Sequence, residues 1–248
     1  LALWRKELST EEEEDFTTLI HKRLSGLSVA VIVGSKEFYG LQFLVNRDVL
    51  IPRPETEILV DKSLELIDSL VPNSDIRILD LCTGSGCIAI ALKHLRPHLA
   101  ITAIDLSPAA LEIARANERN LLAKGQEITW LLGNLFDALP PPGPSSLFDI
   151  IVSNPPYIAA NEIPCLAPEV LAEPRLALIG GSKDGLDIIR KIIAQAPLYL
   201  KERGSILIEA GGNQGQAIAE EFKKNSFINS QLFDDLAGIP RVSLAYRP

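Results

Sequence analysis

The sequence predicts an α/β fold with a doubly wound, mostly parallel sheet of seven strands. Two observations lead to this class. From residue 76 onward, short apolar segments alternate with helical ones, which is the order of elements that builds a parallel sheet. Within this region, residues 150–152 form a continuous apolar run followed by the small Ser153, as expected for a strand that helices cover on both faces.

Ahead of this region the sequence predicts a helix, a hairpin and an elbow. Ser9 has Glu12 three residues later, a capping-box pattern, and the surrounding acidic run suits the positive end of a helix, so we expect a helix over 9–25. Alternating residues around Phe43 indicate a short hairpin. A proline-rich elbow follows, and then a helix from about Glu55.

The α/β region contains five strands, separated by turns and helices, and a closing pair. Ser107 and Pro108 have the residue types of a helix N-cap and first turn. The expected strands are 76–81, 100–106, 127–132, 148–153 and 204–210, the expected helices are 87–95, one from 108 and 185–200, and the antiparallel pair is 231–236 with 241–247.

We divide the chain into three parts: a partial helical domain over 1–37, a hairpin and linker over 38–54, and the main domain over 55–248. A chain of 248 residues has room for one sizeable domain and an appendage. The sequence contains no methionine, even at position 1, so we expect a trimmed or processed N-terminus.

Composition excludes some classes of protein. The net charge of -8 argues against a surface built mainly to bind a nucleic-acid backbone. Three cysteines, without a secretory segment before them, suit a reducing cytoplasm. No stretch approaches the roughly 18 apolar residues of a membrane span. We therefore expect a cytoplasmic protein that does not enter the membrane.

A glycine-rich turn follows the first strand of the main domain. Asp80 ends that strand, Gly84 and Gly86 let the backbone approach a ligand closely, and Asp105 ends the next strand, where it can accept hydrogen bonds from ribose hydroxyls. This pattern alone fits either NAD(P) or S-adenosylmethionine. A purely structural glycine turn is the third possibility.

The motif Asn154-Pro155-Pro156-Tyr157 ends the fourth strand, at the edge where open α/β sheets carry their chemistry. Asn154 has a carbonyl acceptor in its side chain, and the Pro155 carbonyl lies in a stretch that cannot join a strand ladder. Two such acceptors suit an NH2 group, and Tyr157 offers a flat face to a planar amide or base.

A primary amide or exocyclic amine is a poor nucleophile because its lone pair is delocalised. Holding both of its N–H bonds from one side directs that lone pair toward a methyl group on a sulfonium, and such positioning supplies much of the catalysis. The motif therefore favours S-adenosylmethionine over NAD(P) and requires no metal.

The sequence resembles the class I S-adenosylmethionine-dependent methyltransferases with an [N/D/S]-PP-[Y/F/W] motif, and within them the release factor glutamine methyltransferases, also called HemK or PrmC. The resemblance extends from Leu24 onward. It lies in "KEFYGLQFLVNRDVLIPRPETEILV", "ILDLCTGSGCIAIAL", "IDLSPAALEIARAN", "SNPPYI", "EPRLALIGGSKDGLDIIRKI" and "DLAGIPRVSLA", of which "PRPETE" and "EPRLAL" separate this family from other methyltransferases.

The resemblance implies a Rossmann-like domain, the methylation of class 1 peptide chain release factors on the N5 amide of a Gly-Gly-Gln glutamine, and the roles of individual residues. Catalytic and substrate-binding roles fall on Asn154, Pro155, Pro156 and Tyr157, with Arg53, Pro54, Glu55 and Thr56 at the substrate elbow. Cofactor-binding roles fall on Asp80, Cys82, Thr83, Gly84, Ser85, Gly86, Asp105, Leu106, Asn134, Leu135 and Asn154.

Three departures from the family pattern stand out. Family members usually carry aspartate where Asn134 stands, which affects the expected adenine contact. The segment "SVAVIVG" lacks the proline and tyrosine common there. The family's N-terminal helical domain is longer than the part of this chain before Phe38.

Two histidines, a cysteine and an acid lie outside these motifs. His94 and His98 have a metal-chelating spacing, but Pro97 lies between them and no carboxylate or cysteine cluster accompanies them, so we expect no metal site. Cys87 is interpreted as a small buried residue. Glu209 ends the fifth strand on the same rim as Asn154 and is interpreted equally as a site residue or as a strand-end acid.

Three functional hypotheses follow. The first is a protein-glutamine methyltransferase that acts on release factors and binds no nucleic acid directly. The second is an adenine-N6 methyltransferase on DNA or RNA, because the motif also fits an exocyclic amine. The third is a non-catalytic module that binds S-adenosylmethionine. The acidic net charge disfavours the second hypothesis, and the intact Asn-Pro-Pro-Tyr motif disfavours the third.

Overall fold

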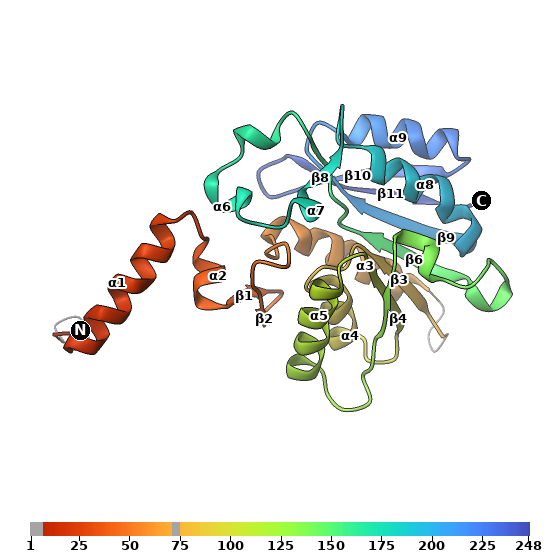
Figure 1. Cartoon of the computed structure of the whole chain (residues 1–248). Coiled ribbons are helices and arrows are strands. Elements are labelled where there is room, and N and C mark those ends of the chain that lie inside the picture. Colours follow the sequence, from red (N-terminus) through yellow and green to blue (C-terminus); the bar gives the residue numbers. More distant parts are fainter. Residues whose placement is uncertain (1–6, 71–74) are drawn as a thin grey trace.

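The computed structural model describes residues 7–70 and 75–248 (Figure 1). In this part of the chain, a seven-stranded sheet has the order β10-β11-β9-β6-β3-β4-β5. Strand β11 is antiparallel to β9 and β10, and the other pairings are parallel. The strands are β3 (Arg77–Leu81), β4 (Ala100–Asp105), β5 (Thr129–Leu132), β6 (Phe148–Ser153), β9 (Leu200–Glu209), β10 (Ile228–Asp234) and β11 (Pro240–Tyr246).

This arrangement confirms the predicted fold class and the antiparallel closing pair. The predicted strands agree with the observed ones, with ends that differ by a few residues.

Helices cover both faces of the sheet (Figure 1). On one face, α3 (Glu57–Ser69) and α4 (Cys87–Leu95) pack on apolar side chains such as Ile78 and Val152. On the other face, α8 (Asp187–Tyr199) and α9 (Gly215–Lys224) pack on the alternate residues, such as Leu79 and Ile151. The central strands are thus apolar on both faces, which explains their continuous apolar sequence.

The strand order reverses at the centre of the sheet. From β3 the chain crosses outward to β4 and β5, and it then returns to place β6 on the other side of β3. Helix α5 (Pro108–Leu121) makes the connection from β4 to β5, and Ser107 caps it by accepting a hydrogen bond from the Ala110 N–H. Such a reversal leaves a crevice at the carboxyl ends of the two central strands.

The N-terminal elements lie outside the sheet. Helix α1 (Thr10–Leu24) begins with the predicted capping box between Ser9 and Glu12, buries none of its residues, and projects away from the main domain (Figure 1). Helix α2 (Val29–Val33) and the hairpin of β1 (Ser35–Phe38) and β2 (Leu41–Leu44) connect it to the elbow. Residues 1–6 of the predicted helical part lie outside the described residues.

Several short elements complete the chain. The predicted hairpin begins at Ser35, ahead of the boundary that we placed at Phe38.

Helix α9 had no counterpart among the predicted elements, because its first turn has no side-chain cap and begins with glycine. The others are η2 (Pro54–Thr56), η3 (Leu135–Ala138), η4 (Pro144–Ser146), β7 (Ile158–Ala159), η5 (Ile163–Cys165), α6 (Pro168–Leu171), α7 (Arg175–Leu178) and β8 (Ile179–Gly181).

Among the described helices, none combines the length and the apolar character that crossing a membrane requires.

Candidate active site

A cleft opens at the carboxyl ends of β3, β4 and β6, where ligands bind in sheets of this topology. It contains about 1090 Å³ of empty space, part of which is open to solvent. Residues of the elbow, between 48 and 56, form one further wall, and residues between 174 and 179 form another. The cleft is large enough for a ligand of nucleoside size.

The cleft brings together most of the residues that the sequence singled out. Those that line it are Arg53, Thr56, Cys82, Thr83, Gly84, Ser85, Asp105, Leu106, Asn134, Leu135, Asn154 and Pro156. The cleft lining does not include Pro54, Glu55, Asp80, Gly86, Pro155 and Tyr157. Of these, Asp80, Gly86 and Pro155 are buried.

The turn between β3 and α4 approaches the cleft with its backbone. Cys82, Gly84 and Gly86 have positive φ angles of 60°, 56° and 80°. A Cβ atom at Gly86 would lie 2.8 Å from the Trp130 ring, closer than real Cβ contacts. Position 86 therefore requires glycine both for its φ angle and for its packing.

Asp105 at the end of β4 is held by backbone donors. Its Oδ2 accepts the Gly84 N–H at 2.7 Å, and its Oδ1 accepts the Ser107 N–H at 2.9 Å. Burial raises the pKa of Asp105, and these two hydrogen bonds oppose that rise. Because each carboxylate oxygen accepts more than one hydrogen bond, the group can also accept bonds from a diol in the cleft.

Two buried oxygen atoms beside the turn, Asp80 Oδ1 and Ser85 Oγ, have no hydrogen-bond partner in the described part of the chain. The second oxygen of Asp80, Oδ2, accepts the Thr83 hydroxyl at 2.6 Å. Burial raises the pKa of Asp80 to about 7. Because unpaired buried polar atoms are costly and Ser85 lines the cleft, its hydroxyl is a candidate contact for a polar ligand, whereas Asp80 lies behind the turn and does not line the cleft.

Asn154 directly follows β6, and a hydrogen bond orients its amide. The Asn154 Nδ2 donates to the Thr56 hydroxyl oxygen at 3.1 Å. The Asn154 Oδ1 is buried and finds no partner among the residues that the structure describes. Asn154 therefore lines the cleft and has a side-chain carbonyl acceptor that is free among the described residues.

Close packing fixes the backbone after Asn154. A Cβ atom at Gly180 would lie 2.4 Å from the Pro156 carbonyl oxygen, and one at Gly185 would lie 2.0 Å from that of Tyr157. The Gln214 side chain also donates to the Tyr157 carbonyl at 2.8 Å. Burial, together with the charge of Glu209, raises the pKa of Tyr157 to about 12, so its phenol is neutral at ordinary pH.

An ion pair joins the elbow to the opposite wall of the cleft. The Arg53 Nη2 lies 2.6 Å from the Glu173 Oε1, and the Glu173 Oε2 accepts the Ile51 N–H at 3.2 Å. Only 3% of the Glu173 side chain is exposed. Pro174 and Leu176 follow Glu173 and line the cleft, so the pair fixes one wall relative to the other.

Comparison with known proteins identifies the family to which this chain belongs. The model of the methyltransferase small domain matches residues 59–181. Release factor glutamine methyltransferase from Neisseria gonorrhoeae is 40% identical over 239 residues, which are 96% of this chain and 84% of that protein. The enzyme of the same name from Thermodesulfovibrio yellowstonii is 38% identical over 238 residues, 96% of this chain and 83% of that protein. This chain belongs to the release factor glutamine methyltransferase family.

Solved structures support the fold of this family member. A methyltransferase from Pyrococcus furiosus matches with a TM-score of 0.60 and 16% identity over 93% of this chain and 98% of that one. The hMettl16 catalytic domain, in complex with a MAT2A 3′UTR hairpin, matches with a TM-score of 0.65 and 16% identity over 94% of this chain and 92% of that one. At this identity the likeness concerns the fold alone.

Sequence reasoning missed two polar residues that shape the site of this methyltransferase. Glu173 carries the ion pair across the cleft, and its signal was the "EPRLAL" segment that distinguishes the family. Gln214 is buried and bridges the Tyr157 and Asp184 carbonyls with its amide. Nothing in the local sequence around Gln214 indicated this role, because its partners lie far away in the chain.

Glu209 was left open between two interpretations, and the structure places it beside the cleft. It is 1% exposed, and the Thr56 and Asn154 side chains lie within hydrogen-bonding reach of its carboxylate.

His94 lies in the last turn of α4, which ends before Pro97 as the sequence indicated. In the described part of the chain, no three histidine, cysteine or acidic residues group as metal ligands would.

Proposed function

We propose that this chain transfers a methyl group from S-adenosylmethionine to the side-chain N5 of the glutamine in the Gly-Gly-Gln motif of class 1 peptide chain release factors. One observation carries the proposal. The Asn154 Oδ1, a buried carbonyl acceptor with no partner among the described residues, lines the cleft of a member of this methyltransferase family. A primary amide is the kind of group that satisfies it.

The residues around the glycine turn fit S-adenosylmethionine. Asp105 has acceptor positions left for the two ribose hydroxyls, and the backbone of Gly84 has open space beside it for the close approach of a ligand. The unpaired hydroxyl oxygen of Ser85, which lines the cleft, suits a ligand with N–H or O–H donors. Cys82 and Thr83 would border the methionine part, and Leu106, Asn134 and Leu135 the adenine.

When bound, S-adenosylmethionine supplies an electrophilic methyl group on a sulfonium. The chain's own residues orient the nucleophile. The Asn154 Oδ1 and the Pro155 carbonyl accept the two N–H bonds of the glutamine amide, and the neutral Tyr157 ring packs against the amide plane. Transfer would join the methyl carbon to the amide nitrogen and break the sulfur–carbon bond, so that S-adenosylhomocysteine would leave and the nitrogen would give up one proton to solvent.

The elbow of Arg53, Pro54, Glu55 and Thr56 borders the entry of the substrate, with Pro156 on the facing side. The glycines of a Gly-Gly-Gln loop permit close approach because they lack side chains. Free glutamine would fit the slot but bring no remote contacts to position it. We further propose that the elements before Phe38 help to dock the release factor, and that the enzyme works in the cytoplasm.

Incubation with labelled S-adenosylmethionine tests this function. We expect one methyl group on the Gly-Gly-Gln glutamine of an intact release factor, little transfer to a short Gly-Gly-Gln peptide, and none to free glutamine or to duplex DNA. A release factor with that glutamine changed to alanine is the matched control. Mass spectrometry locates the methyl group, and a methyl on adenine with the release factor untouched would overturn the proposal in favour of an adenine-N6 methyltransferase.

A further inference from the structure

Glu209 is a buried acid whose presence at the cleft needs an explanation. It ends β9, next to the end of β6, where Ser153 pairs with Ile208. It is 1% exposed, and its Oε2 lacks a hydrogen-bond partner in the described part of the chain. A glutamine of the same shape would avoid the cost of burying a carboxylate, so a reason for the charge is to be sought in its neighbours.

Those neighbours connect Glu209 to Asn154. Thr56, which is 1% exposed, and the Asn154 amide both lie within hydrogen-bonding reach of the Glu209 carboxylate. The Asn154 Nδ2 also donates to the Thr56 hydroxyl oxygen. The three side chains come from η2, from the loop after β6 and from the end of β9, and they form one buried polar cluster.

The chemistry of the three groups fixes the direction of their hydrogen bonds. An ionised carboxylate only accepts, whereas a hydroxyl has one donor and an amide has distinct donor and acceptor ends. With Glu209 ionised, the Thr56 hydroxyl donates to it, and the Thr56 oxygen is then free to accept from the Asn154 Nδ2. Both amide protons of Asn154 thus face the cluster, which leaves its buried Oδ1 as the free end of the amide.

We propose that Glu209 is a positioning residue that, together with Thr56, keeps the Asn154 carbonyl rather than its NH2 turned toward the substrate. This inference rests on the proposed function, because it concerns how the substrate NH2 finds an acceptor. A donor at position 209 would permit the Asn154 amide to flip, and the amide would then present its NH2 to the NH2 of the substrate.

The surroundings of Glu209 give the arrangement a pH dependence. Burial raises the pKa of Glu209 to about 7, the hydrogen bond from Thr56 and the charge of Arg241 lower it, the charge of Glu55 raises it, and the Asn154 amide lowers it. Arg241 forms its ion pair with Asp235 instead. Tyr157 and Cys87 also face Glu209, and both have a pKa raised to about 12, so neither titrates near neutral pH.

The test compares Glu209→Gln, Thr56→Val and Thr56→Ser. Glu209→Gln and Thr56→Val keep the shape of the side chain but no longer fix the direction of the hydrogen bonds to the Asn154 amide. We therefore expect turnover to fall by roughly 100-fold in each, as for other lost orienting contacts. Thr56→Ser should recover most of the loss seen in Thr56→Val. The double variant Glu209→Gln/Thr56→Val should lose little more than either single variant, because the two act through one amide.

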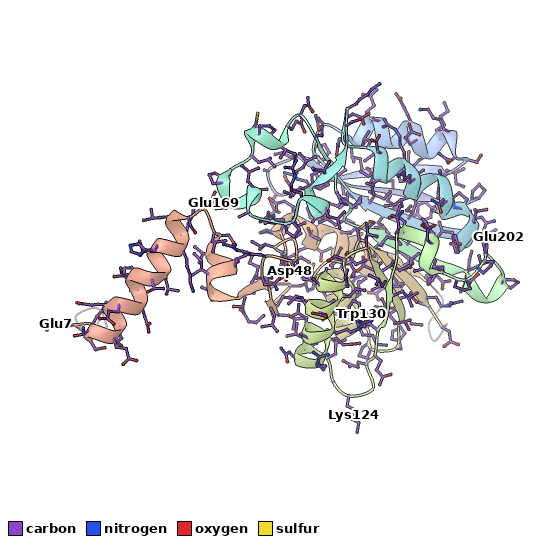
Figure 2. All side chains as sticks on the ribbon, viewed as in Figure 1. Glu7, Asp48, Lys124, Trp130, Glu169 and Glu202 are labelled. Carbon is purple, nitrogen blue, oxygen red and sulfur yellow. The ribbon has the colours of Figure 1, made fainter. Side chains whose placement is uncertain are left out.

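A matched control and a pH profile separate positioning from a merely structural role. Glu202 lies on the same strand at its other end and is exposed, so Glu202→Gln should leave turnover unchanged (Figure 2). In the unsubstituted enzyme, turnover should rise with pH through about 7, and this rise should be absent in Glu209→Gln. Unchanged turnover and an unchanged pH profile in Glu209→Gln would overturn the inference.

A measurement without substrate makes the result independent of the proposed function. The side-chain NH2 resonances of Asn154, assigned from the spectrum of Asn154→Ala, should shift as the pH passes through about 7 and should not shift in Glu209→Gln. Absence of this shift in the unsubstituted chain would refute the coupling. If the chain methylates adenine and not the release factor, the proposed function fails, while the resonances still decide the role of Glu209.

Discussion

At the scale of single residues, the site is defined by polar atoms that the folded chain leaves without partners. Asp80 Oδ1, Ser85 Oγ, Asn154 Oδ1 and Glu209 Oε2 are buried and unpaired among the described residues, and Ser85 and Asn154 line the cleft. Most buried polar groups in proteins are hydrogen-bonded, so such a concentration is typical of a binding site. The atoms near Asp80 belong to the proposed cofactor side and Asn154 to the substrate side.

This division predicts that two substitutions have different effects. Asp105→Ala removes acceptors for the ribose hydroxyls and should weaken the binding of S-adenosylmethionine by roughly tenfold or more. Asn154→Ala removes the acceptor for the substrate NH2 and should lower turnover by roughly 100-fold with a much smaller change in cofactor affinity. Calorimetry measures the affinity and the methylation assay measures the turnover. Tight binding of NADH, or nearly full turnover in Asn154→Ala, would contradict these roles.

At the scale of elements, the cleft depends on contacts between segments that are distant in sequence. The Arg53–Glu173 ion pair connects the elbow to the segment after α6, and Glu173 also accepts the Ile51 N–H. Glu169 of α6, which is labelled in Figure 2, forms an ion pair with Arg23 of α1. The Arg53–Glu173 ion pair therefore holds the elbow against the facing wall, while strand ends of the sheet line the rest of the cleft.

We expect Glu173→Ala to lower the free energy of unfolding by about 1–3 kcal/mol, because it leaves the Ile51 N–H and the Arg53 guanidinium without their partner. Glu173→Gln keeps an acceptor for the N–H and should cost less. Glu65→Ala serves as the matched control, since the Lys62–Glu65 pair is exposed and should contribute less than about 1 kcal/mol. Urea denaturation measures all three. Equal losses in Glu173→Ala and Glu65→Ala would contradict a stabilising role of the Arg53–Glu173 pair between the elbow and the facing wall of the cleft.

At the scale of the whole molecule, two buried acids connect function with stability. Burial raises the pKa of Asp80 and of Glu209 to about 7, well above the values expected in an unfolded chain. Between the two values the native state binds more protons than the unfolded state. The contribution of these two groups to stability is therefore fully present at low pH and is lost as the pH rises through about 7.

We accordingly predict that the free energy of unfolding falls between about pH 5 and about pH 8, by more in the unsubstituted chain than in Glu209→Gln. Glu209→Gln should be the more stable protein at about pH 8, although its turnover is lower. Arg190 holds the pKa of Asp184 at about 2, so that group titrates below this window. Denaturant titrations at several pH values measure the difference, and parallel pH curves for both proteins would contradict the prediction.

The sequence by itself determined the features that depend on short stretches of chain. The apolar strands, the glycine turn, the Ser9 and Ser107 caps and the Asn-Pro-Pro-Tyr motif all follow from local residue types, and they were sufficient for the fold class. Local residue types also placed Gly84, Asp105 and Asn154 in the cleft, and the family resemblance added others such as Arg53, Thr56 and Leu135. Helix α9 was not predicted, because its glycine start gives no local cap signal and packing of Ile218 and Phe222 on the sheet stabilises it.

Tertiary structure decided which polar groups act together. Thr56, Asn154 and Glu209 come from three separate segments, and Arg53 and Glu173 are 120 residues apart. No local pattern reveals such partners, since a hydrogen bond or an ion pair depends on distance in space. The raised pKa values of Asp80 and Glu209 have the same origin. They arise because elements that are distant in the sequence pack over the two carboxyl groups and exclude water. Such burial exists only in the folded chain and cannot be read from the local sequence.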